Sequence, residues 1–264
     1  MADPLAVATL IVYLILLQPT LFCFWAHGRR GFLGWWFLQV FCFIRIAGNA
    51  VQLHEDATHD TSSHALLINS IGLSPLMLAA SGILHEARRA RNPAIRPKLE
   101  WFLVIQYHLL VSAALAFIIV GVVQLESGTK TSSTSVVLKT GLAVLFISWV
   151  VLMFWSASCL LFSRADSNAP AYVAGTMLLY GILVALPLVV FRIVYGAISL
   201  MLELNHPSSS FLASTVAKVL LSTVPEMIVT IILLAAGIST RNMYKGLGRW
   251  RRVDTESVDL MDRK

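Results

Sequence analysis

Seven long stretches of apolar residues limit the possible folds of this chain more than any other feature. Each is long enough for an α-helix to cross a bilayer core of about 30 Å, which takes about 20 residues. They span residues 5–26, 32–53, 65–84, 101–124, 136–162, 172–202 and 211–238. Lipid cannot satisfy free backbone N–H and C=O groups, and the stretches lack the alternation of barrel strands. We therefore predict an all-α polytopic membrane bundle of seven transmembrane helices.

The composition agrees with a membrane protein. Hydrophobic residues make up 57% of the chain and charged residues 13%, whereas soluble domains carry about 25% charged residues. The excess of 20 lysines and arginines over 14 acidic residues is too small to indicate a nucleic-acid-binding protein. The sequence has no nucleotide-binding loop, so any transport would be passive or driven by an ion gradient. We expect the lipid bilayer as a partner, no nucleic acid and no cofactor.

The positions of lysine and arginine predict which side each connection faces. The first apolar stretch has no basic residue before it and is followed directly by Arg29 and Arg30, so we expect an N-terminus outside the membrane. The outer connections would then hold Lys130, and the cytoplasmic segments would hold fifteen of the 20 basic residues. The fifteen are Arg29, Arg30, Arg88, Arg89, Arg91, Arg96, Lys98, Arg164, Arg241, Lys245, Arg249, Arg251, Arg252, Arg263 and Lys264. This asymmetry predicts seven crossings and a cytoplasmic C-terminus.

Residues near the predicted inner side indicate contacts with the membrane surface. Trp25, Trp35, Trp36 and Trp101 stand at the inner ends of their stretches, where an indole ring can stay apolar while its N–H stays hydrated. The segment 239–264 begins basic and turns acidic from Asp254. We interpret it as a cytoplasmic tail that is either solvated or bound to anionic lipid.

Polar residues inside the apolar stretches mark the candidate site, because a charge at mid-membrane is costly unless it faces a partner or water. In the second stretch, Arg45, Asn49 and Gln52 share one helix face. The sixth adds Arg192 and Tyr195, the third adds Asn69, and the seventh places Glu226 deep in a polar stripe. Most of these positions fall in the outer half. They predict an outward-opening polar pocket made by Arg45, Asn49, Gln52, Asn69, Arg192, Tyr195 and Glu226.

One acid and two arginines at compatible depths allow two interpretations. Glu226 would pair with either Arg45 or Arg192, which would leave the second arginine to meet an anionic ligand group or a water-filled cavity. Alternatively, the three charges form a buried ion-pair network that only locks three helices together.

Other titratable residues favour structural roles. His108 in the fourth stretch is expected to be a core histidine bonded to a neighbour. The connection 54–64 carries His54, His59 and His64 with three acids, a set that is either a solvated polar loop or a zinc site of unfamiliar spacing. All three cysteines lie inside apolar stretches, so we expect them to pack in the membrane domain; they are Cys23, Cys42 and Cys159.

Three short motifs carry a resemblance to known families. They are Ser70-Ile71-Gly72-Leu73-Ser74-Pro75-Leu76, Phe191-Arg192-Ile193-Val194-Tyr195 and Pro225-Glu226. With them the chain resembles a family of fungal seven-helix membrane proteins with a domain of unknown function, whose members often look like neighbours of secondary-metabolite genes. More distantly it is similar to the fungal lipid-translocating exporters. The resemblance implies a seven-helix fold over nearly the whole chain and a lipid or secondary metabolite as ligand.

These observations lead to two hypotheses about function. The first is a transmembrane domain, residues 1–238, whose pocket binds or moves a small amphiphile, a lipid or a fungal secondary metabolite, with the tail 239–264 in the cytoplasm. The alternative is a membrane-bound enzyme of secondary metabolism that resembles terpenoid cyclases and uses Glu226 as an acid. Such cyclases look to need acids on two helices, and no second carboxylate stands between the ends of the predicted helices.

The predicted orientation is testable in intact cells. A tag placed after Lys264 should be protected from added protease, while a tag inserted near Asp60 should be cleaved, because the loop charges set the orientation. Western blots before and after permeabilisation measure both. Cleavage of the C-terminal tag in intact cells would show that the orientation is the reverse.

Overall fold

The computed structural model describes residues 3–58, 72–126, 132–161, 167, 169–205 and 214–244, and its regular elements are helices. Five of these elements are long α-helices, and the last span is made of three consecutive helical pieces. The elements are α1 (Pro4–Thr58), α3 (Leu73–Arg91), α4 (Pro97–Glu126), α5 (Ser132–Leu161), α6 (Tyr172–Asn205), α8 (Thr215–Lys218), the π-helical turn η1 (Val219–Thr223) and α9 (Val224–Thr240). The predicted all-α class is confirmed for the described residues.

Within the described residues, five helical segments are long and apolar enough to cross a membrane. They are Pro4–Thr58, Pro97–Leu125, Ser133–Leu161, Tyr172–Leu202 and Thr215–Thr240. Large apolar side chains remain exposed along them, with Trp25, Phe154 and Leu161 each more than 70% exposed. Exposed apolar surface on this scale is expected where lipid is the solvent. The chain is therefore a multi-pass membrane protein.

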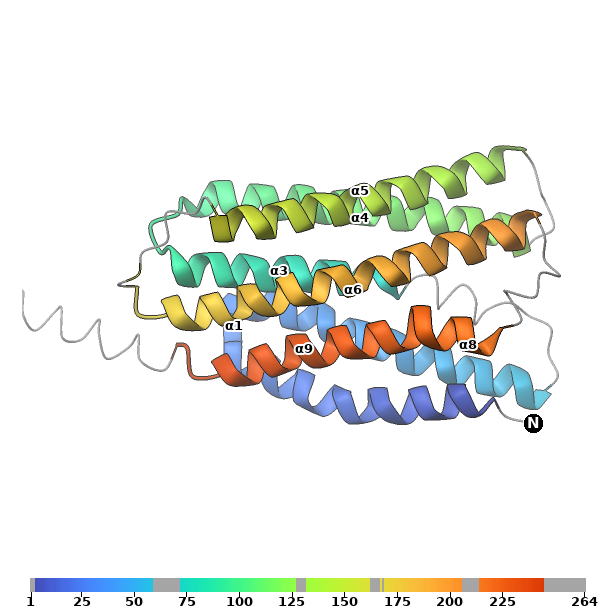
Figure 1. The fold of residues 1–264 in the computed structure, drawn as a ribbon, viewed down its shortest axis with the longest axis horizontal. Helices are drawn as coiled ribbons and strands as arrows, with labels where there is room; N and C mark the ends of the chain where they lie inside the picture. The colour runs from blue at the N-terminus through green and yellow to red at the C-terminus, as the bar shows by residue number, and fades with distance from the viewer. Residues whose placement is uncertain are drawn as a thin grey trace, which may run out of the picture.

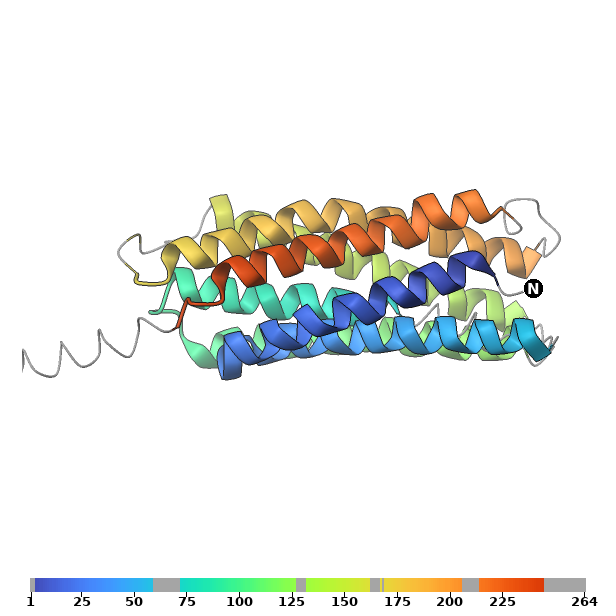
Figure 2. The same ribbon diagram turned by 90° about the horizontal axis from the view of Figure 1, so that it is seen from below.

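Helix α1 is a hairpin of two arms. A straight helix of 55 residues would be about 80 Å long, far more than a bilayer core needs. At Gly28 the backbone leaves the helical region, with φ of 56° and ψ of −146°, a conformation that glycine adopts without steric cost. The chain reverses there, and the two arms run side by side (Figure 2). The Thr20 hydroxyl donates to Gln39 Oε1 across them at 2.6 Å.

The elements form three layers (Figure 1). Helices α4 and α5 pack together at one side, α3 and α6 lie in the middle, and the α1 hairpin with α8–α9 forms the other side. The apolar core runs through the middle layer, where Leu76, Leu178 and Leu186 are almost fully buried. Contacts of α3 with α1, α4, α5 and α6 make it the central helix.

The third predicted helix has different bounds from those expected. Residues 65–71 of the predicted span 65–84 lie outside the described residues, and α3 (Leu73–Arg91) continues past residue 84 to Arg91. Its last turns contain His85, Glu86 and Arg91, which are all buried. A sequence rule that ends a membrane helix at its first charges fails here, because neighbouring helices surround α3 and supply polar partners for those charges.

Glycines allow α3 to pack closely against α1. A Cβ on Gly34 would lie 2.6 Å from the backbone nitrogen of Ile83, and one on Gly82 would lie 2.6 Å from Gly34 Cα. Such distances leave no room for any side chain. Small residues at a helix interface let backbones approach in lipid, where close packing replaces the hydrophobic effect as the main attraction between helices.

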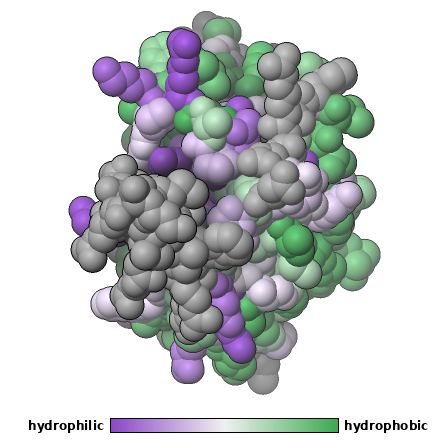
Figure 3. Space-filling model, turned by 90° about the vertical axis from the view of Figure 1, so that its left-hand side faces the viewer, coloured by the Kyte–Doolittle hydropathy of each residue, from purple (hydrophilic) through white to green (hydrophobic). Residues whose placement is uncertain are grey.

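The tryptophans separate into two groups. Trp25, Trp36 and Trp101 are 76%, 46% and 44% exposed, as expected of interfacial residues. Trp35 is fully buried, so its predicted place at the membrane surface is wrong. Figure 3 shows the end of the bundle where α3 and α9 finish, with hydrophilic side chains on the end face and hydrophobic ones around much of its edge.

Some predictions fall outside the described residues. These are the interpretation of the tail from residue 245 on, and the possible zinc ligands His59 and His64. Among the residues that are described, no group of three His, Cys, Asp or Glu side chains is arranged to hold a metal ion. His108 is bonded to a neighbour as predicted, with Nδ1 2.8 Å from the carbonyl oxygen of Val104, but it is half-buried rather than in the core.

Candidate functional site

A cavity of about 530 Å³ lies at the end of the bundle where the chain begins, and α1, α3, α4, α5, α6 and α8–α9 contribute to its lining. Its two sides differ in chemistry. Ile118 of α4 and Leu142 and Leu145 of α5 make an apolar wall. The α1 hairpin and the α8–α9 segment make the opposite wall, which is mostly polar; its side chains include Arg45, Asn49, Gln52, Glu55, Asp56, Lys218, Ser222, Thr223 and Glu226.

The deepest polar group is a carboxylate that two arginines share. Glu226 Oε1 accepts a hydrogen bond from Arg45 Nη2 and another from Arg192 Nε, the latter at 2.5 Å. All three side chains are buried, with 3% to 8% of each side chain exposed. The expectation that Glu226 pairs with only one arginine is wrong, because both reach the same oxygen. The network joins α1, α6 and α9.

Local backbone features hold this network in place. The Asn49 amide donates to the carbonyl oxygen of Arg45 at 2.6 Å, and the Thr230 hydroxyl donates to that of Glu226 at 2.8 Å. Pro225 cannot donate a backbone hydrogen bond, and its ring would clash with the preceding turn of a regular helix. The π-helical turn Val219–Thr223 ends two residues before Pro225. Such turns accommodate irregular backbone and often occur at functional sites.

The mouth of the cavity carries acids and a lysine. Gln52 Nε2 donates to Asp3 Oδ2 at 3.0 Å, and the backbone N–H of Asp3 donates to Asp56 Oδ2 at 3.1 Å. These bonds fasten the start of the chain to the last turns of α1. Lys218 lies within electrostatic range of Asp3 and Asp56 and also of the two arginines.

Six of the seven residues predicted for the pocket line this one cavity. They are Arg45, Asn49, Gln52, Arg192, Tyr195 and Glu226. The seventh, Asn69, lies outside the described residues. The predicted pocket did not include Glu55, Asp56 and Lys218, which also line the cavity. Glu55 and Asp56 follow Asn49 and Gln52 along α1, and Lys218 shares the polar stripe of Glu226.

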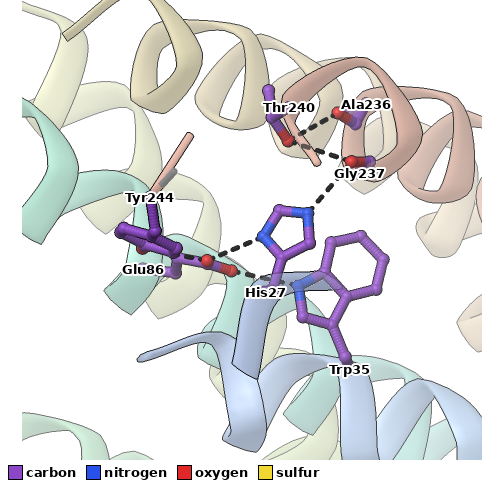
Figure 4. Close-up of polar contacts among 7 residues, drawn as sticks. All are labelled: His27, Trp35, Glu86, Ala236, Gly237, Thr240 and Tyr244. Atoms are coloured by element: carbon purple, nitrogen blue, oxygen red, sulfur yellow. Dashed lines mark hydrogen bonds and ion pairs between the residues drawn. The ribbon is translucent and has the colours of Figure 1, made fainter. Parts of the chain in front are cut away.

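A second buried carboxylate occupies the other end of the bundle (Figure 4). Glu86 Oε1 lies 2.8 Å from His27 Nδ1 and accepts a hydrogen bond of 3.0 Å from the Tyr244 hydroxyl, while Oε2 accepts one of 3.0 Å from Trp35 Nε1. His27 Nε2 lies 3.0 Å from the carbonyl oxygen of Gly237. We call His27, Trp35, Glu86 and Tyr244 the Glu86 cluster. It joins both arms of α1 to α3, to the end of α9 and to the segment that follows.

The Glu86 cluster holds one proton between its acid and its base. A backbone carbonyl only accepts hydrogen bonds, so His27 Nε2 must carry a proton. The remaining contact, between His27 Nδ1 and Glu86 Oε1, needs one more proton, which either residue can carry. Losing that proton or gaining another would leave a net charge on a fully buried pair, which is costly. The pair is therefore suited to fixing the helices in place.

The Glu86 cluster has no room for another molecule. A Cβ on Gly31 would lie 2.5 Å from Glu86 Oε2, and a side chain on Gly237 would overlap the indole ring of Trp35. The sequence signal that could have revealed the cluster is the run His85-Glu86-Ala87-Arg88, in which the histidine and the glutamate both turn out to be buried. A third acid, Glu100 of α4, is also buried and lies 3.2 Å from Arg88 Nη1.

Comparison with known proteins places the chain in a family. A family model described as a domain of unknown function, DUF7702, matches residues 1–243. The chain belongs to the DUF7702 family. No curated protein and no solved structure matches it. The DUF7702 match includes every residue of the cavity lining and all of the Glu86 cluster except Tyr244.

The shared carboxylate predicts a specific pattern of stabilities. Glu226→Gln should lower the free energy of unfolding by about 3 kcal/mol, because it leaves two buried guanidinium groups without their counter-charge. Adding Arg45→Gln or Arg192→Gln should recover part of that loss in either case, since both arginines contact Glu226. Unfolding in detergent of these three variants, of Arg45→Gln and Arg192→Gln alone, and of the wild type measures the coupling. Additive losses for either arginine would remove that residue from the network.

Tyr244 predicts a dependence on pH. Burial, and the negative charge of Glu86, raise the pKa of the Tyr244 phenol above its usual value. The neutral phenol donates to Glu86, so Tyr244→Phe should cost about 1–2 kcal/mol of stability at neutral pH. A raised pKa in the folded state means that this contribution is complete below about pH 10 and declines as the pH rises further. Thermal unfolding of both proteins at pH 7.5 and 10.5 tests it; a gap that widens at the higher pH would contradict the assignment.

Proposed function

We propose that the chain crosses the membrane seven times, with its N-terminus outside, and that its cavity opens outward and binds or moves a small amphiphile. The reversal at Gly28 supports this count, because it gives α1 two arms of membrane-crossing length. Helix α3 would add a crossing that is shielded from lipid, since all but two of its 19 residues are buried. The two arms of α1, together with α3, α4, α5, α6 and α8–α9, would make seven crossings.

The two-sided cavity is the observation that carries the proposal. An amphiphile needs apolar contact along its chain and polar partners at its head group, and this cavity offers the two on opposite walls. Arg45 and Arg192 give the cavity two cations at its deep end, and Lys218 adds a third nearer the mouth. An acidic head group would find its partners there. A lipid or a secondary metabolite, as the fungal resemblance implies, fits this description.

The alternative of acid catalysis by Glu226 has less support. Protonating Glu226 would remove the charge that two arginines contact, which is unfavourable in a buried network. Two other carboxylates, Glu86 and Glu100, are buried in α3 and α4. Glu86 belongs to the cluster beside Gly237, which is 11 residues from Glu226 and so about 16 Å farther along the last helix. The two acids are too far apart to act on one reacting centre.

Lys218 allows the binding role to be separated from the structural one. It lines the cavity but makes no contact with Glu226 among the described ion pairs. In neutral detergent, dodecyl phosphate should raise the unfolding temperature of the full-length protein in a dose-dependent way, because a ligand that binds the folded state stabilises it. Lys218→Gln should weaken the apparent affinity about tenfold, with little change in stability without ligand.

Lys139→Gln is the matched control, since it removes the same charge from α5 at a position outside the cavity lining. It should leave the affinity for dodecyl phosphate unchanged. Equal weakening by both substitutions would mean that the probe responds to net charge alone, and the pocket proposal would then fail.

A further inference from the structure

The charges around the cavity are sorted by depth. Arg45, Arg192 and Glu226 lie at the bottom, where two positive groups meet one negative group. Glu55 and Asp56 line the mouth. The described lining residues carry three cations and three acids in all. Among these residues, those at the bottom have a net positive charge and those at the mouth a net negative charge.

Distances along α1 confirm this separation. Asp56 follows Arg45 by 11 residues, which is about 16 Å along a helix. Exposure changes over the same interval, since Arg45 and Asn49 are 5% and 8% exposed while Glu55 and Asp56 are half-buried. The hydrogen bonds around Asp3 fix Asp56 at the mouth.

Lys218 links the two zones. It lies within electrostatic range of Asp3 and Asp56 and of both arginines. Glu226 follows it by eight residues, so Lys218 stands about 12 Å above the deep carboxylate. A ligand that enters the cavity therefore passes acids first and meets increasing positive charge as it goes deeper.

We propose that the ligand is a zwitterionic amphiphile. Its acidic group would lie toward Arg45, Arg192 and Lys218, its amino or quaternary ammonium group toward Glu55 and Asp56, and its chain along the apolar wall. A purely anionic head group meets repulsion at the mouth, and a purely cationic one meets repulsion at the bottom. The inference rests on the proposed function, since it names the class of amphiphile that the cavity binds.

Three probes with the same twelve-carbon chain test the inference. They are dodecylphosphocholine, which is zwitterionic, dodecyl phosphate, which is anionic, and dodecyltrimethylammonium, which is cationic. Each is titrated below its micelle-forming concentration into the full-length protein in maltoside detergent, and thermal unfolding gives an apparent affinity. Dodecylphosphocholine should bind at least tenfold more tightly than either singly charged probe.

The variant Glu55→Gln with Asp56→Asn isolates the acidic mouth. It should bring the affinity for dodecylphosphocholine down about tenfold, to that of dodecyl phosphate, and should leave binding of dodecyl phosphate unchanged or tighter. A control, Asp254→Asn with Glu256→Gln, removes the same charge from the segment predicted to be the cytoplasmic tail and should keep the preference. A preference that survives in the mouth variant would overturn the role of the two acids.

The outcomes separate this inference from the proposed function. If dodecyl phosphate binds wild-type protein as tightly as dodecylphosphocholine, the proposed preference for a zwitterionic head group is wrong, while the proposal of amphiphile binding stands. Free phosphocholine, which lacks the chain, should bind at least tenfold more weakly than dodecylphosphocholine. Equal affinities for free phosphocholine and dodecylphosphocholine would show that the chain does not contribute to binding. The ligand would then be a small polar zwitterion, and the proposal of an amphiphile would fail. Should no probe stabilise the protein, both proposals fail.

Discussion

Two contact networks, each built around a buried carboxylate, hold α1 and α9 together, one near the middle of the bundle and one at its end. Glu226 on α9 contacts Arg45 on α1, and His27 at the turn of α1 contacts both Glu86 and the carbonyl oxygen of Gly237 on α9. In lipid, an ionised side chain without partners is strongly unfavourable, so each contact fixes the relative position of its helices. Helices α1 and α9 are therefore held at two levels, and α6 and α3 each join one of these contacts.

The central position of α3 follows from the same constraint. It contains His85, Glu86 and Arg91, which lipid would not tolerate, and it is surrounded by helices that contact them or cover them. Arg91 donates to the carbonyl oxygen of Cys159 on α5 at 2.7 Å, in addition to the bonds of Glu86 to α1. The most polar of the long helices is thus the most buried one.

The sequence predicted the class of the protein and six polar residues of the cavity lining, because both depend on local patterns. Long apolar stretches identify membrane helices, and helical spacing places Arg45, Asn49 and Gln52 on one face. Reasoning of that kind could not show that one oxygen of Glu226 serves two arginines, since this depends on how α1, α6 and α9 pack. It also missed Glu86, because a charge at the end of an apolar stretch is ordinarily assigned to the surface, and only the surrounding helices show that it is buried.

The two ends of the bundle differ in the space they leave, and this difference assigns them different roles. At Glu86, three hydrogen-bond partners use both carboxylate oxygens, and Gly31 is needed because any side chain there would meet those oxygens. At Glu226, Arg45 and Arg192 both donate to Oε1, and the carboxylate still lines a cavity of about 530 Å³. A fully occupied carboxylate stabilises a fixed arrangement of helices. A carboxylate beside open space keeps two guanidinium groups in position while leaving room for a ligand next to them, so binding is expected at the Glu226 end and rigidity at the Glu86 end.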